Sequence, residues 1–231
     1  MNPEIQEVSM RYQRRKKSFN DRYSLLNFAH LKEEQEKELA IVRWIRSFGV
    51  SPLPMRRVLE IGCGTGSNLL QLLRLGFRPE NLVGSELLTD RLEECRRLLP
   101  SSIRLIPGDA TEIDIPDGSF DIVFQSTVFT SILDKDFQFR LARSMWRLIK
   151  PGGGVLWYDF IYDNPKNPDV RGIELKQVKT LFPDGRMKYW RLTLAPPISR
   201  RVTRVHPFLY HVFNMFPFLR THVLCWIQKI A

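Results

Sequence analysis

Three glycines at alternate positions mark the stretch of this sequence that is best suited to binding a ligand. Gly62, Gly64 and Gly66 follow the apolar run Val58–Ile61, and a helical pattern begins directly after them. Glycines allow positive φ angles and let a ligand approach the main chain closely. The following helix offers free N–H groups and a positive dipole end to a negative ligand group. The spacing therefore predicts a binding turn between strand and helix, with a plain structural turn as the alternative.

Two neighbours of this turn narrow the choice of ligand. Glu60, just before it, places a carboxylate where a ligand with a positive end is favoured. Dinucleotide-binding turns have a third glycine three residues after Gly64, where this sequence has Ser67. The sequence therefore disfavours a dinucleotide-dependent oxidoreductase.

Polar residues also stand where further strands are predicted to end. Glu86 ends the predicted strand 81–86. Its distance in sequence from the glycine turn is that at which a carboxylate accepts hydrogen bonds from the two hydroxyls of a ribose. Asp109 and Ala110 follow the strand 103–106. They suit an adenine edge, because the carboxylate accepts from the exocyclic amine while the Ala110 N–H donates to a ring nitrogen. An exposed strand-end acid and an Asx-type turn, respectively, are the alternatives.

Strand and helix patterns alternate from residue 57 to residue 160, which predicts an α/β fold with a doubly wound, mainly parallel sheet. The strands are expected near 57–61, 81–86, 103–106, 120–125, 155–160, 189–194 and 221–230. The helices are expected near 30–48, 67–75, 89–98, 134–150, 172–181 and, once or twice, within 199–216. Residues 1–28 indicate a polar, basic arm of uncertain order.

Size and cysteine content favour one domain in a reducing compartment. The 231 residues suit a single α/β domain with additions, and no apolar run is long enough to cross a bilayer. No apolar signal-peptide core opens the chain. Cys63, Cys95 and Cys225 form neither a metal-ligand spacing nor a disulfide framework, and the four histidines are scattered, so we expect no metal site. A cytoplasmic location is expected.

The charge of the chain is uneven. The net charge is +10, and no Asp or Glu occurs from residue 185 to residue 231. This basic C-terminal stretch favours an anionic partner, such as a phosphate, a lipid head group or a nucleic acid, with a solvated basic face as the alternative. Apolar residues beside Arg200, Arg201 and Arg204 also suit a peripheral contact with the inner face of a membrane.

The order of these motifs resembles the class I S-adenosylmethionine-dependent methyltransferases of the type 11-like kind. The matching features are the turn at 60–66, Glu86, the run 108–110, and the segments 120–123 and 148–153. The resemblance covers residues 57–160. It implies a seven-stranded Rossmann-like sheet with an antiparallel last strand, which 221–230 fits.

The resemblance implies S-adenosylmethionine as the cofactor and assigns its contacts by position. Glu60 and the turn would face the methionine end, Glu86 would hold the ribose, and Gln125 would lie near the sulfonium. The expected cofactor residues are Glu60, Gly62, Cys63, Gly64, Gly66, Glu86, Leu87, Asp109, Ala110 and Gln125.

Methyl transfer from the sulfonium to an oxygen or nitrogen is the activity that the resemblance implies. A hydroxyl acceptor profits from a general base by about 10²–10⁴-fold. Asp159 at the end of the fifth strand is expected to be that base, with a loop cap as its alternative role. His206 and His211 are less favoured candidates. The expected acceptor contacts are Tyr12, Tyr23, Tyr158 and His206.

The flanks resemble a narrower bacterial group found near polysaccharide or glycolipid genes, which implies a small-molecule, sugar or lipid-linked acceptor. The stretches that carry this resemblance are 23–24, 158–160, 164–172 and 194–197. We expect residues 1–55 to form an N-terminal arm and helix that acts as a lid. Residues 56–231 would form the methyltransferase domain, with 196–219 as a substrate-side insertion. Aromatic residues in that insertion would line an apolar acceptor pocket or complete the core.

Two other functions remain open at this stage. An RNA methyltransferase is favoured by the isoelectric point of about 9.8. It is disfavoured by the Ser126-Thr127-Val128-Phe129 run after the fourth strand, where base-amine enzymes usually have Asn/Asp-Pro-Pro-aromatic. A non-catalytic cofactor-binding module is disfavoured by the intact glycine turn and both carboxylates.

Overall fold

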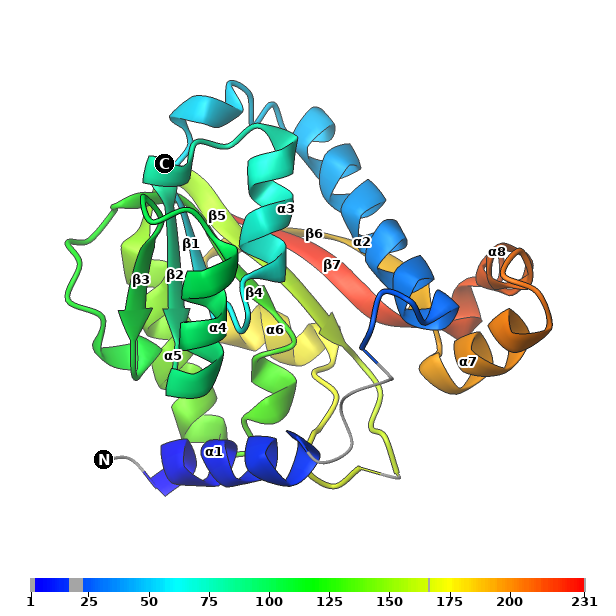
Figure 1. Ribbon diagram of the computed structural model, residues 1–231. Helices are drawn as coiled ribbons and strands as arrows, with labels where there is room; N and C mark the ends of the chain where they lie inside the picture. The colour runs from blue at the N-terminus through cyan, green and yellow to red at the C-terminus, as the bar shows by residue number, and fades with distance from the viewer. Residues whose placement is uncertain (1–2, 17–22, 166, 231) are drawn as a thin grey trace.

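The described strands form one mixed sheet. The computed structural model describes residues 3–16, 23–165 and 167–230 of the chain. Seven strands lie in the order β3-β2-β1-β4-β5-β7-β6 (Figure 1). Strands β1 to β5 are parallel, whereas β7 runs antiparallel between β5 and β6. The predicted doubly wound sheet with an antiparallel last strand is confirmed.

The elements lie close to where the sequence pattern predicts them. The strands are β1 (Val58–Ile61), β2 (Leu82–Glu86), β3 (Arg104–Pro107), β4 (Phe120–Ser126), β5 (Ile149–Phe160), β6 (Gly185–Leu194) and β7 (Arg220–Lys229). The α-helices are α1 (Pro3–Lys16), α2 (Phe28–Ser47), α3 (Ser67–Leu75), α4 (Thr89–Leu98), α5 (Lys135–Leu148), α6 (Leu175–Leu181), α7 (Pro196–Val205) and α8 (Leu209–Asn214). Short 3-10 helices are η1 (Leu53–Met55), η2 (Pro79–Asn81), η3 (Ala110–Glu112), η4 (Phe129–Ser131) and η5 (Pro217–Leu219).

Side-chain caps fix the starts of α2 and α5. Asn27 Oδ1 accepts the N–H of Ala29 at the start of α2 over 3.0 Å. Asp134 Oδ1 accepts the N–H of Phe137 at the start of α5 over 2.6 Å. Each cap satisfies a backbone donor that has no partner within its helix, which explains why both helices begin where they do.

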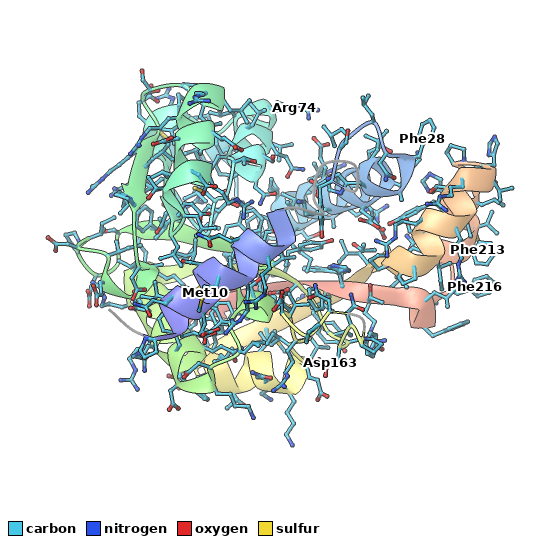
Figure 2. The ribbon with its side chains drawn as sticks, turned by 60° about the horizontal axis from the view of Figure 1, so that its bottom comes forward. Met10, Phe28, Arg74, Asp163, Phe213 and Phe216 are labelled. Carbon is cyan, nitrogen blue, oxygen red and sulfur yellow. The ribbon has the colours of Figure 1, made fainter. Side chains whose placement is uncertain are left out.

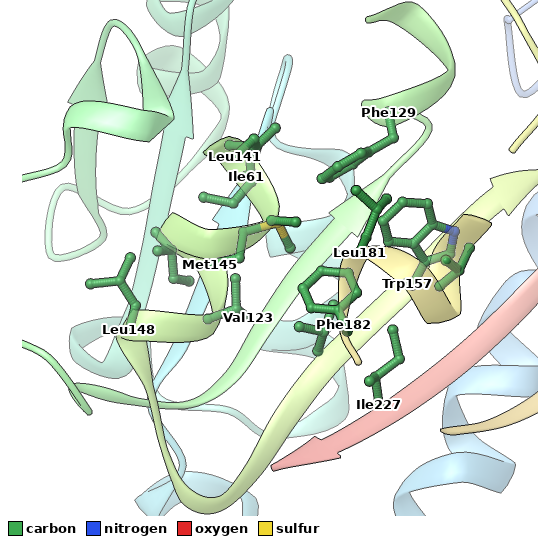
Figure 3. Packing of buried hydrophobic residues seen from close by; sticks show 14 of the residues in the cluster. Ile61, Val123, Phe129, Leu141, Met145, Leu148, Trp157, Leu181, Phe182 and Ile227 are labelled. Atoms are coloured by element: carbon green, nitrogen blue, oxygen red, sulfur yellow. The ribbon is translucent and has the colours of Figure 1, made fainter. Parts of the chain in front are cut away.

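Helices cover both faces of the sheet, and the core has two halves. Helices α5 and α6 pack on one face, which we name the α5 face. Helices α2, α3 and α4 pack on the other, which we name the α2 face. Figure 3 shows the core of the α5 face, where the ring centroids of Phe129 and Trp157 lie 4.4 Å apart. Successive strand residues alternate between these faces, so the site residues on the strands are divided between them.

Strand β5 begins earlier than the sequence pattern suggests. The run 151–154 predicts a turn, but the structure extends the strand back to Ile149. A Cβ atom on Gly154 would lie 2.6 Å from the carbonyl oxygen of Ile227 in the neighbouring strand. The glycine therefore permits a close backbone approach within the sheet rather than a turn before it.

The two segments with the least regular patterns are helical. The N-terminal arm forms α1, while residues 17–22 of the arm lie outside the described part of the chain. Pro196 and Pro197, which the sequence suggests as strand breakers, occupy the first turn of α7, where a missing N–H costs no helical hydrogen bond. None of the helices in the described residues combines the length and apolar character that a membrane span requires.

Candidate functional site

Five predicted ligand-binding segments end at one edge of the sheet. The register pairs Ile61 of β1 with Ser85 of β2 and with Gln125 of β4. It also pairs Glu86 with Pro107 of β3. We name this side of the sheet, where β1 to β5 end, the carboxyl edge. In Figure 1 the arrowheads of β2 and β3 point toward it, and α1 lies across it.

The glycine turn and the acid of β2 are joined directly. Gly64 donates its backbone N–H to Glu86 Oε2 over 2.7 Å, and Leu88 donates its N–H to Oε1 over 2.9 Å. Gly62, Gly64 and Gly66 have φ angles of 64°, 57° and 91°, values that favour glycine. Because a carboxylate offers about four acceptor positions, Glu86 can accept two further bonds from a diol.

Glu60 is a buried carboxyl group with one unpaired oxygen. Asn68 Nδ2 donates to Oε1 over 2.6 Å, while Oε2 has no hydrogen-bond partner among the described residues. Burial raises the pKa of Glu60 to about 8, although the bond from Asn68 acts in the opposite direction. Asn68 Oδ1 in turn accepts from the buried Lys37 of α2 over 2.9 Å. A polar chain therefore links helix α2 to the carboxyl group beside the turn.

Helix α1 is fixed across the carboxyl edge by a buried ion pair. Arg11 contacts Glu4 with Nη1 and Nη2, at 2.9 and 3.1 Å, and both residues are buried. Arg11 Nη1 also donates to the carbonyl oxygen of Ser131, and Glu4 Oε1 accepts the N–H of Leu133. The loop after β4 and α1 are therefore held together.

Helix α1 also contacts a residue that packs against the glycine turn. The guanidinium of Arg91 on α4 lies over the Tyr12 ring, 5.2 Å from its centroid. A Cβ on Gly64 would lie 2.5 Å from Arg91 Nη2, and one on Gly62 would lie 2.5 Å from Val128 Cγ2. Arg91 and Val128 therefore pack against the turn. The lid role assigned to residues 1–55 stays a prediction.

The segment after β3 has the geometry of an Asx-type turn. Asp109 Oδ1 accepts the N–H of Thr111 over 2.8 Å and caps η3. Gly108 donates its N–H to the carbonyl oxygen of Glu86, which ties the ends of β2 and β3 together. Leu87 is partly buried against the core. The contact of Asp109 and Ala110 with an adenine ring stays a prediction.

The residues at the ends of β4 and β5 belong to the α5 face. Gln125 is fully buried, and its Oε1 accepts the N–H of Val128 over 3.0 Å. Asp159 is fully buried as well; it accepts from Thr130 Oγ1 over 2.7 Å and from the Phe160 N–H over 3.1 Å. Burial raises the pKa of Asp159 to about 7, against the lowering effect of the Thr130 bonds. Glu60 lies on the opposite face, with Asn68 of α3.

The four predicted acceptor contacts are not brought together. Tyr12 lies on α1 and Tyr23 is exposed beside His30 at the start of α2. Tyr158 is buried on the α2 face, where its hydroxyl pairs with Thr193 Oγ1 at 2.8 Å. His206 is exposed at the end of α7. Their contact with an acceptor stays a prediction.

Three residues that the sequence did not single out accompany Glu60 and Tyr158. His222 of β7 stacks on the Tyr158 ring with centroids 5.2 Å apart. Burial, with a smaller effect of Lys37, lowers the pKa of His222 to about 3, so its imidazole is neutral. Lys37 lies 5.5 Å from the centroid of the Tyr158 ring. Only Asn68 had a usable signal, since it stands in the first turn after the glycines; Lys37 and His222 come from distant elements.

Comparison with known proteins assigns the central part of the chain to a family. Residues 58–153 match the family described as methyltransferase domain. The chain is 36% identical over 105 residues to a fatty-acid O-methyltransferase of Mycolicibacterium smegmatis, covering 45% of this chain and 37% of the relative. It is 32% identical over 149 residues to a demethylmenaquinone methyltransferase of Deinococcus radiodurans, covering 62% and 57%. The chain thus spans less than two thirds of each relative.

Solved structures show the same fold. An S-adenosylmethionine-dependent methyltransferase from Archaeoglobus fulgidus superposes with a TM-score of 0.60 at 19% identity, covering 86% of this chain and 98% of that one. Residues 58–153 thus match a methyltransferase domain, and the chain has the fold of an S-adenosylmethionine-dependent methyltransferase. The narrower resemblance to a polysaccharide- or glycolipid-linked group stays a prediction.

The carboxyl edge fits the cofactor that this family implies. Glu60 Oε2, buried and unpaired, suits the positively charged amino group of S-adenosylmethionine. Glu86 has acceptor positions left for the two ribose hydroxyls. The exposed start of α3 after Gly66 supplies backbone donors for the carboxylate of the methionine end.

Proposed function

We propose that this protein transfers a methyl group from S-adenosylmethionine to a small-molecule acceptor. The observation that carries the proposal is the buried, unpaired oxygen of Glu60 beside a glycine turn that is bonded to Glu86. A buried acceptor without a partner is costly, and a cationic ligand group removes that cost. The cofactor contacts that the sequence predicts for the glycine turn and the strand ends are part of this proposal.

The residues of the chain have to bind and align, because the cofactor supplies an electrophilic methyl group. Alignment of the reacting groups contributes as much as about 7–11 kcal/mol to lowering such a barrier. Glu60 and Glu86 would hold the two ends of the cofactor at fixed points of the turn. Val128 and helix α1 would limit the access of water from above the carboxyl edge.

The acceptor is proposed to be apolar or lipid-linked. Two relatives are named for fatty-acid and demethylmenaquinone methylation, and both names describe lipophilic acceptors. Tyr158 and His222 provide a stacked aromatic surface on the α2 face, next to the Lys37–Asn68–Glu60 chain. This surface is proposed to hold the apolar part of the acceptor, while its hydroxyl group would reach Asp159 at the carboxyl edge, where β5 ends. The sequence resemblance of the flanking segments favours a sugar acceptor, which the turnover screen described below includes.

Asp159 is the proposed general base for a hydroxyl acceptor. A base works best when its pKa is near the working pH, and burial places that of Asp159 at about 7. Its oxygens accept from Thr130 and Phe160, and because a carboxylate offers about four acceptor positions, it can still accept a proton.

Calorimetry and turnover together test the proposal. S-adenosylmethionine is titrated into the protein, and formation of S-adenosylhomocysteine is then measured with fatty-acid, quinol, lipid-linked sugar and RNA acceptors. We expect binding, and turnover with one of the apolar acceptors. Binding without turnover on any acceptor would favour a cofactor-binding module, and turnover on RNA alone would favour an RNA methyltransferase. Absence of binding would end the proposal.

A further inference from the structure

Exposed apolar side chains gather between β6 and β7. We name residues 196–219, which contain α7, α8 and η5, the projecting unit. Seven large apolar side chains are exposed within its positions 205–218: Val205, Phe208, Val212, Phe213, Met215, Phe216 and Phe218. Met215 is 74% and Phe218 72% exposed. A patch of exposed apolar side chains of this kind marks an interaction site.

The projecting unit that carries these exposed side chains is held to helix α2 by hydrogen bonds. Tyr210 is buried, and its hydroxyl donates to Glu36 of α2 over 2.6 Å. Asn214 Nδ2 donates to the same carboxylate over 2.7 Å. The side of α7 that faces the protein carries the small polar residues Ser199 and Thr203. The exposed phenylalanines lie on α8 and in the segments beside it, on the outer side of the projecting unit.

The charge of the projecting unit suits an anionic surface. The unit contains no acidic residue, and neither does the rest of the chain from residue 185 onward. Arg201 and Arg204 are exposed, and Arg200 is partly exposed. None of the three forms an ion pair with a described residue. Free guanidinium groups beside exposed phenylalanines are the composition of a surface that lies in a membrane interface.

The unit also lies at the functional edge of the sheet. The register pairs Phe160 with His222 and Leu194 with Arg220, so the segment between β6 and β7 leaves the sheet at the carboxyl edge. Helix α7 packs against α2, whose start carries the exposed Phe28. In Figure 1 the unit extends beyond the sheet, and in Figure 2 Phe213 and Phe216 point outward from it, with Phe28 on the neighbouring helix.

We propose that the projecting unit docks on the surface of a lipid bilayer that contains anionic lipids. The apolar side chains would enter the interface, and the three arginines would contact the head groups. A second copy of the chain is a poorer occupant, because a symmetric contact would bring arginines together with no acid from either unit. The proposal concerns where the protein binds and stands apart from methyl transfer.

Vesicle sedimentation tests the proposal with the full chain. The protein is mixed with vesicles of phosphatidylcholine alone or with about one third phosphatidylglycerol, at about 0.1 M and about 0.5 M salt. We expect binding to the anionic vesicles that weakens in high salt. The double variant Phe216→Ser/Phe218→Ser should bind at least about tenfold more weakly. The variant Arg200→Gln/Arg201→Gln/Arg204→Gln should lose about fivefold for each arginine.

Matched controls separate docking from general effects. Phe139→Ser changes a phenylalanine that is exposed on α5, on the opposite face, and should leave vesicle binding unchanged. Thermal melts check that every variant is folded, which the exposure of the positions favours. Absence of binding to anionic vesicles would overturn the proposal, as would equal binding by the wild-type protein and the double variant. A dimer in light scattering that only the double variant abolishes, without vesicle binding, would assign the patch to self-association.

Discussion

Gly64 donates its backbone N–H to Glu86 Oε2 over 2.7 Å, so the glycine turn and the strand-end acid are one structural unit. The second oxygen of the same carboxylate accepts the Leu88 N–H at the start of the next helix. Glu86 therefore holds the turn in place. The acid proposed to bind the ribose also shapes the loop that would bind the methionine end.

Glu86→Gln should weaken binding of S-adenosylmethionine about 10–100-fold, because one acceptor oxygen and the negative charge are lost while the side chain keeps its length. Calorimetry measures this change directly. Glu93→Gln, an exposed acid on α4, is the matched control and should bind like the wild-type protein. An affinity within about twofold of wild type in Glu86→Gln would remove the ribose role.

Glu60 should make the stability of the protein depend on pH. Its folded pKa is raised by burial to about 8 from an ordinary 4.5, so its favourable contribution is complete below pH 4.5 and declines as the pH rises to about 8. Glu60→Gln removes this loss. The difference between the melting temperatures of the variant and of the wild-type protein should therefore change in the variant's favour by about 3–5 °C per pH unit between these values.

The same residue gives a second readout on ligand binding. A cationic ligand group favours ionised Glu60, so binding of S-adenosylmethionine at pH 7 should release a proton. Calorimetry in two buffers with different ionisation enthalpies detects that proton. Melting curves of wild type and Glu60→Gln that stay parallel across pH, together with binding that releases no proton, would contradict the assignment.

The sequence predicted the parts of the site that depend on local patterns. The glycine turn needs positive φ at three positions, and the strand-end residues follow from apolar runs of the right length. These features are short-range, so they are visible in one sequence. Helix α7 was also expected in outline, within residues 199–216, although the structure begins it at Pro196.

Contacts between distant segments could not be predicted in this way. The Glu4–Arg11 pair has helical spacing, but its bonds to Ser131 and Leu133 join positions more than 100 residues apart. Lys37 has the appearance of an ordinary charge on a polar helix until the fold places it against Asn68. Such pairings are set by how helices pack on the sheet, which a single sequence does not specify.

Arg11→Met should release helix α1 from the carboxyl edge. It breaks a buried ion pair, which typically costs about 3–5 kcal/mol because one charge is left without its partner. We expect faster amide hydrogen exchange in α1 and a lower melting temperature. Arg14→Met is the matched control on the same helix, since Arg14 is 56% exposed in its pair with Asp169, and it should change little.

Acid should open the same contact in the wild-type protein. Burial raises the pKa of Glu4, but the bonds from Arg11 and the Leu133 N–H outweigh it, and the net pKa lies below the ordinary 4.5. The stability that this pair contributes is therefore present above pH 4.5 and lost as the pH falls through the lower, folded value. Exchange in α1 that is the same in acid and at neutral pH would show that the pair does not hold the helix.

Asp159→Asn should separate the two roles open to this carboxyl group. As the general base it should lower kcat about 10²–10⁴-fold with the acceptor identified by the turnover screen, while affinity for S-adenosylmethionine stays within about twofold. Because the pKa of Asp159 is raised to about 7, wild-type kcat should rise with pH and level off above that value, and the variant should lack this step. Thr130→Val removes the hydroxyl that donates to Asp159, which raises its pKa further and should shift the step to higher pH. An Asp159→Asn variant with wild-type kcat and a lower melting temperature would instead make Asp159 a structural partner of the loop after β4.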